Sequence, residues 1–208
     1  MGSVGDMTEP QPLPLPLPQS LRLPLRTERL VLRRFEAGDL DAFYAYHSLP
    51  ATARFLPGEA KSYTKSMESV GKYANFVFEK EGDWICLAIE AADSPGLLGE
   101  VVLKWLPGRG QAEIGWSLAP EARGKGYASE AAEALLKLGF EELGFHRIDA
   151  KLDALNTASA ALCERLGMRL ESTQVDKWHY KGQWATEVVY AILEEEWKSR
   201  QPAEGPPV

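Results

Sequence analysis

The chain has 208 residues, 45% of them hydrophobic, with a net charge of −7 and a sequence pI of about 5.1. This is the composition of a globular protein whose single domain can bury a core without disulfides or metals. The acidic charge argues against a nucleic-acid partner, and the short apolar runs argue against a membrane span. Two separate cysteines, Cys86 and Cys163, and three histidines at no metal-ligand spacing indicate no metal site. Because no secretory signal is visible, we expect a cytoplasmic protein.

The two ends of the chain differ in composition from its middle. Proline and leucine alternate from Pro12 to Pro18, and proline lacks the N–H that a sheet interior requires. We therefore expect residues 1–24 to form a disordered tail, with a docking peptide for an aromatic groove as the alternative. Residues 25–198 should form the folded domain and residues 199–208 a flexible end.

Apolar alternation, helical spacing and turn residues predict the elements between these ends. In chain order, we expect a strand at 30–32, helices at 39–47 and within 60–80, strands at 84–90, 97–106 and 111–118, a helix at 127–143, a strand at 148–155, a helix at 158–166, and strands at 169–178 and 183–192. Gly144 and Gly167 follow two of the helices, as expected of glycine at a helix C-terminus. Consecutive hairpin strands exclude a purely parallel sheet and indicate a mixed α+β fold.

The most informative segment is APEARGKGYASEA, residues 119–131, which follows a strand and begins a helix. Gly124 and Gly126 let the backbone come close to a ligand. The free N–H groups of the first helical turn and the helix dipole then favour an anion. Arg123 and Lys125 add positive charge. The segment is therefore suited to binding a phosphate or pyrophosphate.

Two common phosphate-binding patterns fail on this segment, and a third fits. A Walker P-loop needs glycine at Ala119 and Ser or Thr at Gly126, and a dinucleotide fingerprint needs glycine at Ser129. The third pattern is Arg or Gln, two residues, Gly, one residue, then Gly or Ala. Arg123, Gly126 and Ala128 satisfy it.

On these motifs the sequence resembles the GNAT superfamily of N-acetyltransferases, and most closely its ribosomal-protein alanine acetyltransferase-like branch. The resemblance runs from about Leu25 to Trp197 through LRTERLVLRRFEAGDLDAFYAYH, AEIGWSLAPEARGKGYASEA, DALNTASAALCERLGMRLE and KGQWATEVVYAILEEEW. It implies a central, mostly antiparallel sheet of about seven strands with a splay, and helices on both faces. It also implies metal-free, direct transfer of an acetyl group from acetyl-CoA to a primary amine in a ternary complex. A homodimer stays open, since the family is often dimeric.

The resemblance also implies which residues bind the cofactor. The backbone of the strand before the glycine loop would bind the pantetheine arm, and the loop amides would bind the pyrophosphate. Asn156 would lie near the CoA arm and could also cap the helix that follows it. The implied cofactor residues are Trp116, Ser117, Leu118, Arg123, Gly124, Lys125, Gly126, Tyr127, Ala128, Ser129 and Asn156.

Two residues are implied for catalysis, each with a structural alternative. Glu113, in the AEI triplet, matches the general base of a related branch that acetylates histones, and Glu100 on the neighbouring strand is its rival. Many members protonate the leaving thiolate with a tyrosine at the position of Cys163. Ser159 matches the serine of the branch's Asn-x-x-Ser motif and is the implied acid instead. A salt-bridged surface glutamate and a helix-capping serine are the alternatives.

The amine acceptor follows from proton affinity. A peptide α-amine has a pKa near 8 and a lysine one near 10.4, which makes deprotonation of lysine costlier by about 3 kcal/mol. With no tyrosine acid, we expect a peptide N-terminus or a small amine rather than a lysine side chain. Two other functions remain as alternatives. One is a non-catalytic acyl-CoA-binding sensor or interaction module, and the other is a transferase for another donor such as succinyl-CoA.

Overall fold

The structure, a computed structural model, describes residues 21–56, 58–108, 110–180 and 182–200. The proline–leucine repeat and the rest of residues 1–20 lie outside the described part, as do residues 201–208. The expectations for the two tails therefore fall largely on residues that it does not describe.

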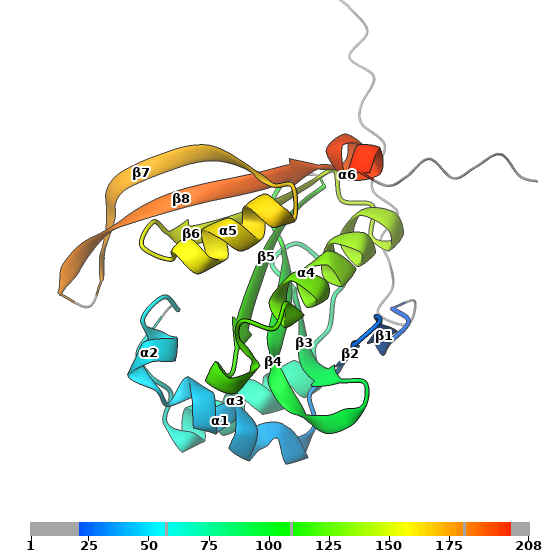
Figure 1. The fold of residues 1–208 in the computed structure, drawn as a ribbon, viewed down its shortest axis with the longest axis vertical. Coiled ribbons are helices and arrows are strands. Elements are labelled where there is room, and N and C mark those ends of the chain that lie inside the picture. Colours follow the sequence, from blue (N-terminus) through cyan, green and yellow to red (C-terminus); the bar gives the residue numbers. More distant parts are fainter. Residues whose placement is uncertain (1–20, 57, 109, 181, 201–208) are drawn as a thin grey trace, which may run out of the picture.

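Within the described residues, eight strands form one sheet in the order β1-β2-β3-β4-β5-β6-β8-β7 (Figure 1). The strands are β1 (Leu25–Arg26), β2 (Leu30–Arg33), β3 (Trp84–Ala91), β4 (Ser94–Trp105), β5 (Gln111–Leu118), β6 (Arg147–Asp153), β7 (Arg169–Tyr180) and β8 (Gln183–Leu193). The helices are α1 (Leu40–His47), α2 (Pro50–Ala53), α3 (Tyr63–Ala74), α4 (Tyr127–Lys137), α5 (Thr157–Arg165) and α6 (Glu194–Arg200). Neighbouring strands are antiparallel except β5 and β6, which are parallel. The predicted mixed, mostly antiparallel sheet is confirmed.

The sheet has eight strands rather than the predicted seven. The additional strand, β1, has two residues and pairs with β2, so it is too short to show an alternating pattern. The four-residue α2 was not predicted either, and it begins with Pro50 in its first turn, where proline is tolerated. The C-terminal α6 also escaped prediction, although its three glutamates at the start suit the helix dipole.

The long helix predicted for residues 127–143 changes its winding near its end. Regular α-helix stops at Lys137, and a π-helical turn follows from Leu138 to Glu142. Gly139, in that turn, lies so close to β6 that a Cβ on it would come within 2.7 Å of Ile148 Cδ1. Gly144 then ends the segment at a φ of 67°, as its position in the sequence predicts.

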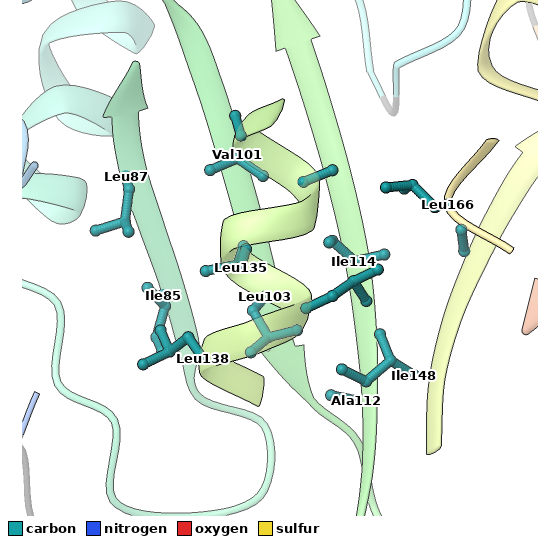
Figure 2. Close-up of a cluster of buried hydrophobic side chains, with 14 of the residues drawn as sticks. Ile85, Leu87, Val101, Leu103, Ala112, Ile114, Leu135, Leu138, Ile148 and Leu166 are labelled. Carbon is teal, nitrogen blue, oxygen red and sulfur yellow. The ribbon is translucent and has the colours of Figure 1, made fainter. Parts of the chain in front are cut away.

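Alternation along the strands divides the core between the two faces of the sheet. On one face, side chains of β3, β4 and β5 pack around α4, and Figure 2 shows this cluster, with Ile85, Leu87, Val101, Leu103, Ile114 and Leu135 among its members. On the other face, Cys86 and Ala88 of β3 contact a second cluster built on α1 and α3, with Phe43 and Val70 at its centre. Helices therefore cover both faces, as expected.

The feature that positions the site is the separation of β5 from β6. Their parallel pairing covers three residue pairs and ends at Glu113 and Asp149. Beyond that point β5 remains paired with β4 as far as Leu118, while β6 remains paired with β8 as far as Asp153. The two central strands therefore diverge, and the β6-facing backbone edge of residues 114–118 has no strand partner in the described ladder. This is the predicted splay.

Candidate active site

The glycine loop connects the end of β5 to the start of α4. After a short 3-10 turn, Pro120–Ala122, the chain passes through Gly124 and Gly126 with φ values of 75° and 81°. Both values lie in the left-handed region, which glycine adopts at little cost. Gly126 is the N-cap of α4, and no side chain caps the helix there. The first-turn N–H groups of α4 are thus left for another partner, next to the diverging strands.

Arg123 holds the loop through its side chain. Its Nε donates to the Leu118 carbonyl oxygen at 3.0 Å, and its Nη2 donates to Thr52 Oγ1 at 3.1 Å. Because Thr52 lies in α2 and Leu118 ends β5, the guanidinium connects the loop to both elements. The sequence predicts Arg123 as a cofactor-binding residue of the glycine-loop pattern, and it does not indicate these two contacts within the protein.

The start of α5 lies against β5 across the splay. Trp116 Nε1 donates to Ser159 Oγ at 3.3 Å, so the two residues predicted from separate motifs meet. Asn156 Oδ1 accepts from the Ser159 backbone N–H at 3.2 Å, which makes Asn156 the N-cap of α5. The capping role is therefore taken by Asn156, and the Ser159 hydroxyl is turned towards β5.

Cys163, at the position where the resemblance leads us to expect a tyrosine, is fully buried in α5. Burial raises the pKa of its thiol to about 12, so the thiol stays protonated at neutral pH. It is packed among side chains of the main core cluster. The structure thus gives Cys163 the surroundings of a packing residue.

Glu113 lies at the last position where β5 pairs with β6, and it forms an ion pair with Lys151. The Lys151 Nζ lies 2.6 Å from Glu113 Oε2, and about a third of each side chain is exposed. Burial works to lower the pKa of Lys151, but the hydrogen bond and charge of Glu113 outweigh it and hold that pKa above its ordinary value. Lys151 therefore remains charged, and the salt-bridged alternative describes the contact that Glu113 makes here.

Glu100, the rival carboxylate, is buried on β4 opposite Ser117 of β5, with 6% of its surface exposed. Its two oxygens contact two neighbouring residues of α1. The Tyr46 hydroxyl donates to one oxygen, and His47 Nε2 lies 2.9 Å from the other. Burial raises the pKa of the Tyr46 hydroxyl well above its ordinary value, and the Glu100 charge adds to this effect. These contacts join the end of α1 to the sheet, and no local sequence pattern indicates that the three residues meet.

Two further findings concern metal binding and membrane spans. Among the described residues, no three His, Cys, Asp or Glu side chains gather in a way that could hold a metal ion. Within the same part of the chain, no helix has the length and apolar character needed to cross a membrane.

Comparisons with known proteins agree with this geometry. The family described as acetyltransferase (GNAT) domain matches residues 29–169. The uncharacterized N-acetyltransferase YnaD of Bacillus subtilis (strain 168) is 36% identical over 174 residues, which cover 83% of this chain and 98% of YnaD. A GNAT-family acetyltransferase from Bacillus anthracis has a crystal structure with a TM-score of 0.75 at 32% identity, covering 82% of this chain and 98% of that one.

A more distant structure shares the fold and contains the cofactor. The spermidine N-acetyltransferase of Vibrio cholerae, in complex with CoA and spermine, has a TM-score of 0.70 at 23% identity, covering 83% of this chain and 99% of that one. The family match and the relatives above 30% identity confirm the resemblance that the sequence motifs indicate. The chain therefore belongs to the GNAT family, whose fold uses acetyl-CoA, and it is an N-acetyltransferase.

Proposed function

We propose that this enzyme transfers an acetyl group from acetyl-CoA to a primary amine, either a peptide N-terminus or a small amine. The observation that carries the proposal is the divergence of β5 from β6 beside the uncapped start of α4. The β6-facing edge of β5 offers the backbone N–H and C=O of Trp116 and the N–H of Leu118 to the pantetheine arm. The Leu118 carbonyl oxygen already accepts from Arg123, and the Ser117 carbonyl oxygen points towards β4. The amides from Gly124 to Ser129 offer N–H donors to the pyrophosphate.

The reaction needs donors for the carbonyl oxygen and a proton for the leaving thiolate. In a direct attack by the amine, the thioester carbonyl oxygen gains negative charge, and N–H groups on the free edge of β5 would stabilise it. Ser159 lies across the splay and would then donate a proton to the departing sulfur. Its Oγ already accepts a hydrogen bond from Trp116, which leaves its own proton free for this purpose.

Glu113 is the proposed general base, and its carboxylate forms an ion pair with Lys151. The base must remove a proton from the amine before attack, so the pKa of the amine itself decides how costly this step is. At pH 7 roughly a tenth of a peptide α-amine is neutral, against about one in a few thousand for lysine. This difference between the two amines supports a low-pKa acceptor.

Glu100 is the second candidate for the base. Glu100 lies opposite Ser117 of β5, but both of its carboxylate oxygens already have partners on α1. Replacing each carboxylate by an amide separates the two candidates while preserving their size. If Glu113 is the base, Glu113→Gln lowers kcat and Glu100→Gln acts mainly on stability; the reverse result assigns the base to Glu100.

The proposed function is tested by release of free thiol from acetyl-CoA in the presence of a panel of amines. The panel holds peptides with free N-termini, α-blocked lysine peptides, polyamines and aminoglycosides, and succinyl-CoA is run in parallel. We expect release with acetyl-CoA and with low-pKa amines. Release with succinyl-CoA alone would replace the donor. Tight CoA binding without thiol release from any pair would favour a non-catalytic sensor.

A further inference from the structure

The glycine loop is held on its outer side by the turn between β1 and β2. Arg29, in that turn, donates from Nη1 to the Lys125 carbonyl oxygen at 3.0 Å. Its guanidinium also lies over the Tyr127 ring, with Cζ 5.1 Å from the ring centroid. A Cβ placed on Gly126 would come within 3.2 Å of Arg29 Nη2. One side chain therefore contacts three consecutive residues of the loop and the helix start.

Arg29 is itself fixed by the first turn of α4. Its Nε and Nη2 lie 2.7 and 2.6 Å from Glu130 Oε2, and its backbone N–H donates to Oε1 at 2.8 Å. The Thr27 hydroxyl donates to the same Oε1 at 2.6 Å. Burial works to raise the pKa of Glu130, but the hydrogen bonds from Thr27 and Arg29 outweigh it and hold that pKa below its ordinary value. Glu130 is therefore ionised at neutral pH.

The bond from Arg29 to Lys125 determines where the next N–H points. In a trans peptide the C=O and the following N–H point in opposite directions, and the cis bond found among the described residues is Leu23–Pro24. Because the Lys125 carbonyl points to Arg29, the Gly126 N–H points away from it. Arg29 thus orients one of the loop amides from the outer side.

This constraint matters because the loop is intrinsically free to rotate. Gly124 and Gly126 both have left-handed φ values, and no side chain caps α4. Fixing the backbone of a residue costs conformational entropy, and a loop already held in its binding conformation does not lose this entropy when the ligand binds. Arg29 supplies this constraint from a segment 96 residues away from Lys125 in the sequence.

The charges around Arg29 argue against its acting as a direct phosphate ligand. The shallow pocket on this side is lined by Glu28, Arg29, Gly126, Ser129, Glu130 and Glu133. Three carboxylates and one guanidinium therefore line this pocket, and Glu130 pairs with the guanidinium directly. A phosphate would meet net negative charge on this outer side.

We propose that Arg29 is a positioning residue for CoA, which holds the Lys125–Gly126 peptide so that the Gly126 N–H faces the phosphates, and that Glu130 in turn holds Arg29. This inference rests on the proposed function, because it requires CoA phosphates at the glycine loop. It adds a role for a residue that makes no contact with the cofactor in this scheme.

The test compares Arg29→Ala and Glu130→Gln with wild type and with Arg169→Ala. Arg169 forms ion pairs with Glu171 and Glu196 at the other end of the sheet and serves as the matched control. The Kd of CoA is measured by calorimetry. Turnover is measured with acetyl-CoA and with acetyl-pantetheine, which lacks the phosphates. Loss of one residue's preorganisation corresponds to about a tenfold weaker affinity.

We expect Arg29→Ala and Glu130→Gln to raise the Kd of CoA and the KM of acetyl-CoA about tenfold. The kcat at saturating acetyl-CoA and the turnover of acetyl-pantetheine should stay at their wild-type values. An unchanged Kd in Arg29→Ala would overturn the proposal. Tighter CoA binding by Glu130→Gln would overturn it too, because freeing the guanidinium helps only a direct ligand. Loss of acetyl-pantetheine turnover would indicate general structural damage and contradict a loop-specific role. Failure of the wild type itself to bind CoA would refute the proposed function, and this inference with it.

Discussion

Replacing Gly99 with alanine should reduce both stability and cofactor binding, because Gly99 lies where β4 packs closely against β5, the strand proposed to bind the pantetheine arm. A Cβ on Gly99 would lie 2.2 Å from the Ser117 carbonyl oxygen and 2.8 Å from Leu118 Cα. Both contacts are to backbone, so no side-chain rotation relieves them. With alanine at this position, β4 and β5 must separate where residue 99 pairs with Leu118. This separation strains the neighbouring hydrogen bond, in which the Ala119 N–H donates to the Leu98 carbonyl oxygen at 2.9 Å.

The expected loss of stability combines two effects. Overpacking costs about 1–3 kcal/mol, and each buried backbone group left without a partner costs about 1–3 kcal/mol. We expect a total of about 3–5 kcal/mol, which corresponds to a shift of about 2 M in the urea midpoint for a slope near 2 kcal/mol/M. Displacement of Ser117 and Leu118 should also raise the KM of acetyl-CoA.

Urea unfolding followed by tryptophan fluorescence measures this loss. Gly71→Ala is the matched control, because nothing lies within 4 Å of a Cβ on this glycine, which is exposed in α3. An alanine there should stabilise the helix by about 0.5–1 kcal/mol. A Gly99→Ala protein as stable as wild type would show that the close backbone contacts at Gly99 do not exclude a side chain there.

Three further predictions concern the site. Ser159→Ala should lower kcat with acetyl-CoA while leaving the Kd of CoA within about threefold, since an acid acts on the leaving group; an unchanged kcat would exclude Ser159 as the donor. Cys163→Ala should reduce the free energy of unfolding by about 1 kcal/mol but keep kcat, because the buried thiol is a packing residue; a large drop in kcat would contradict this. Because the pKa of Glu130 in the folded protein lies below its ordinary 4.5, its ionised form stabilises the fold at higher pH, and this advantage is lost as pH falls through the folded pKa. Glu130→Gln should therefore destabilise the protein at pH 7, and the difference from wild type in urea unfolding should narrow below pH 4.5; a gap that widens in acid would contradict the sign.

The sequence predicts the long elements well, because apolar periodicity along them is strong. The prediction for β5 coincides with the observed Gln111–Leu118, and α1, α5 and the last hairpin differ from prediction by a few residues at most. Short elements escape, since β1 and α2 contain too few residues for a period to show. The π-helical turn after Lys137 escapes because the apolar pattern continues through it.

The same distinction applies to the candidate site: a motif of adjacent residues can be predicted from the sequence, and contacts between distant residues cannot. The glycine loop is visible in the sequence because its residues are adjacent and their spacing is diagnostic. The contacts of Arg29 with Glu130 and of Glu100 with His47 join residues 101 and 53 positions apart. No local pattern indicates which distant side chains will meet. For the same reason, the sequence could not show that Glu113 pairs with Lys151.

We propose that this enzyme acetylates a low-pKa amine at the opening between β5 and β6. The most direct measurement uses mass spectrometry on two peptides of one sequence incubated with acetyl-CoA. One peptide has a free N-terminus and a dimethylated lysine, and the other has a blocked N-terminus and a free lysine. We predict acetylation of the free N-terminus with matching release of CoA. Robust acetylation of the lysine with none at the N-terminus would contradict the proposed low-pKa acceptor.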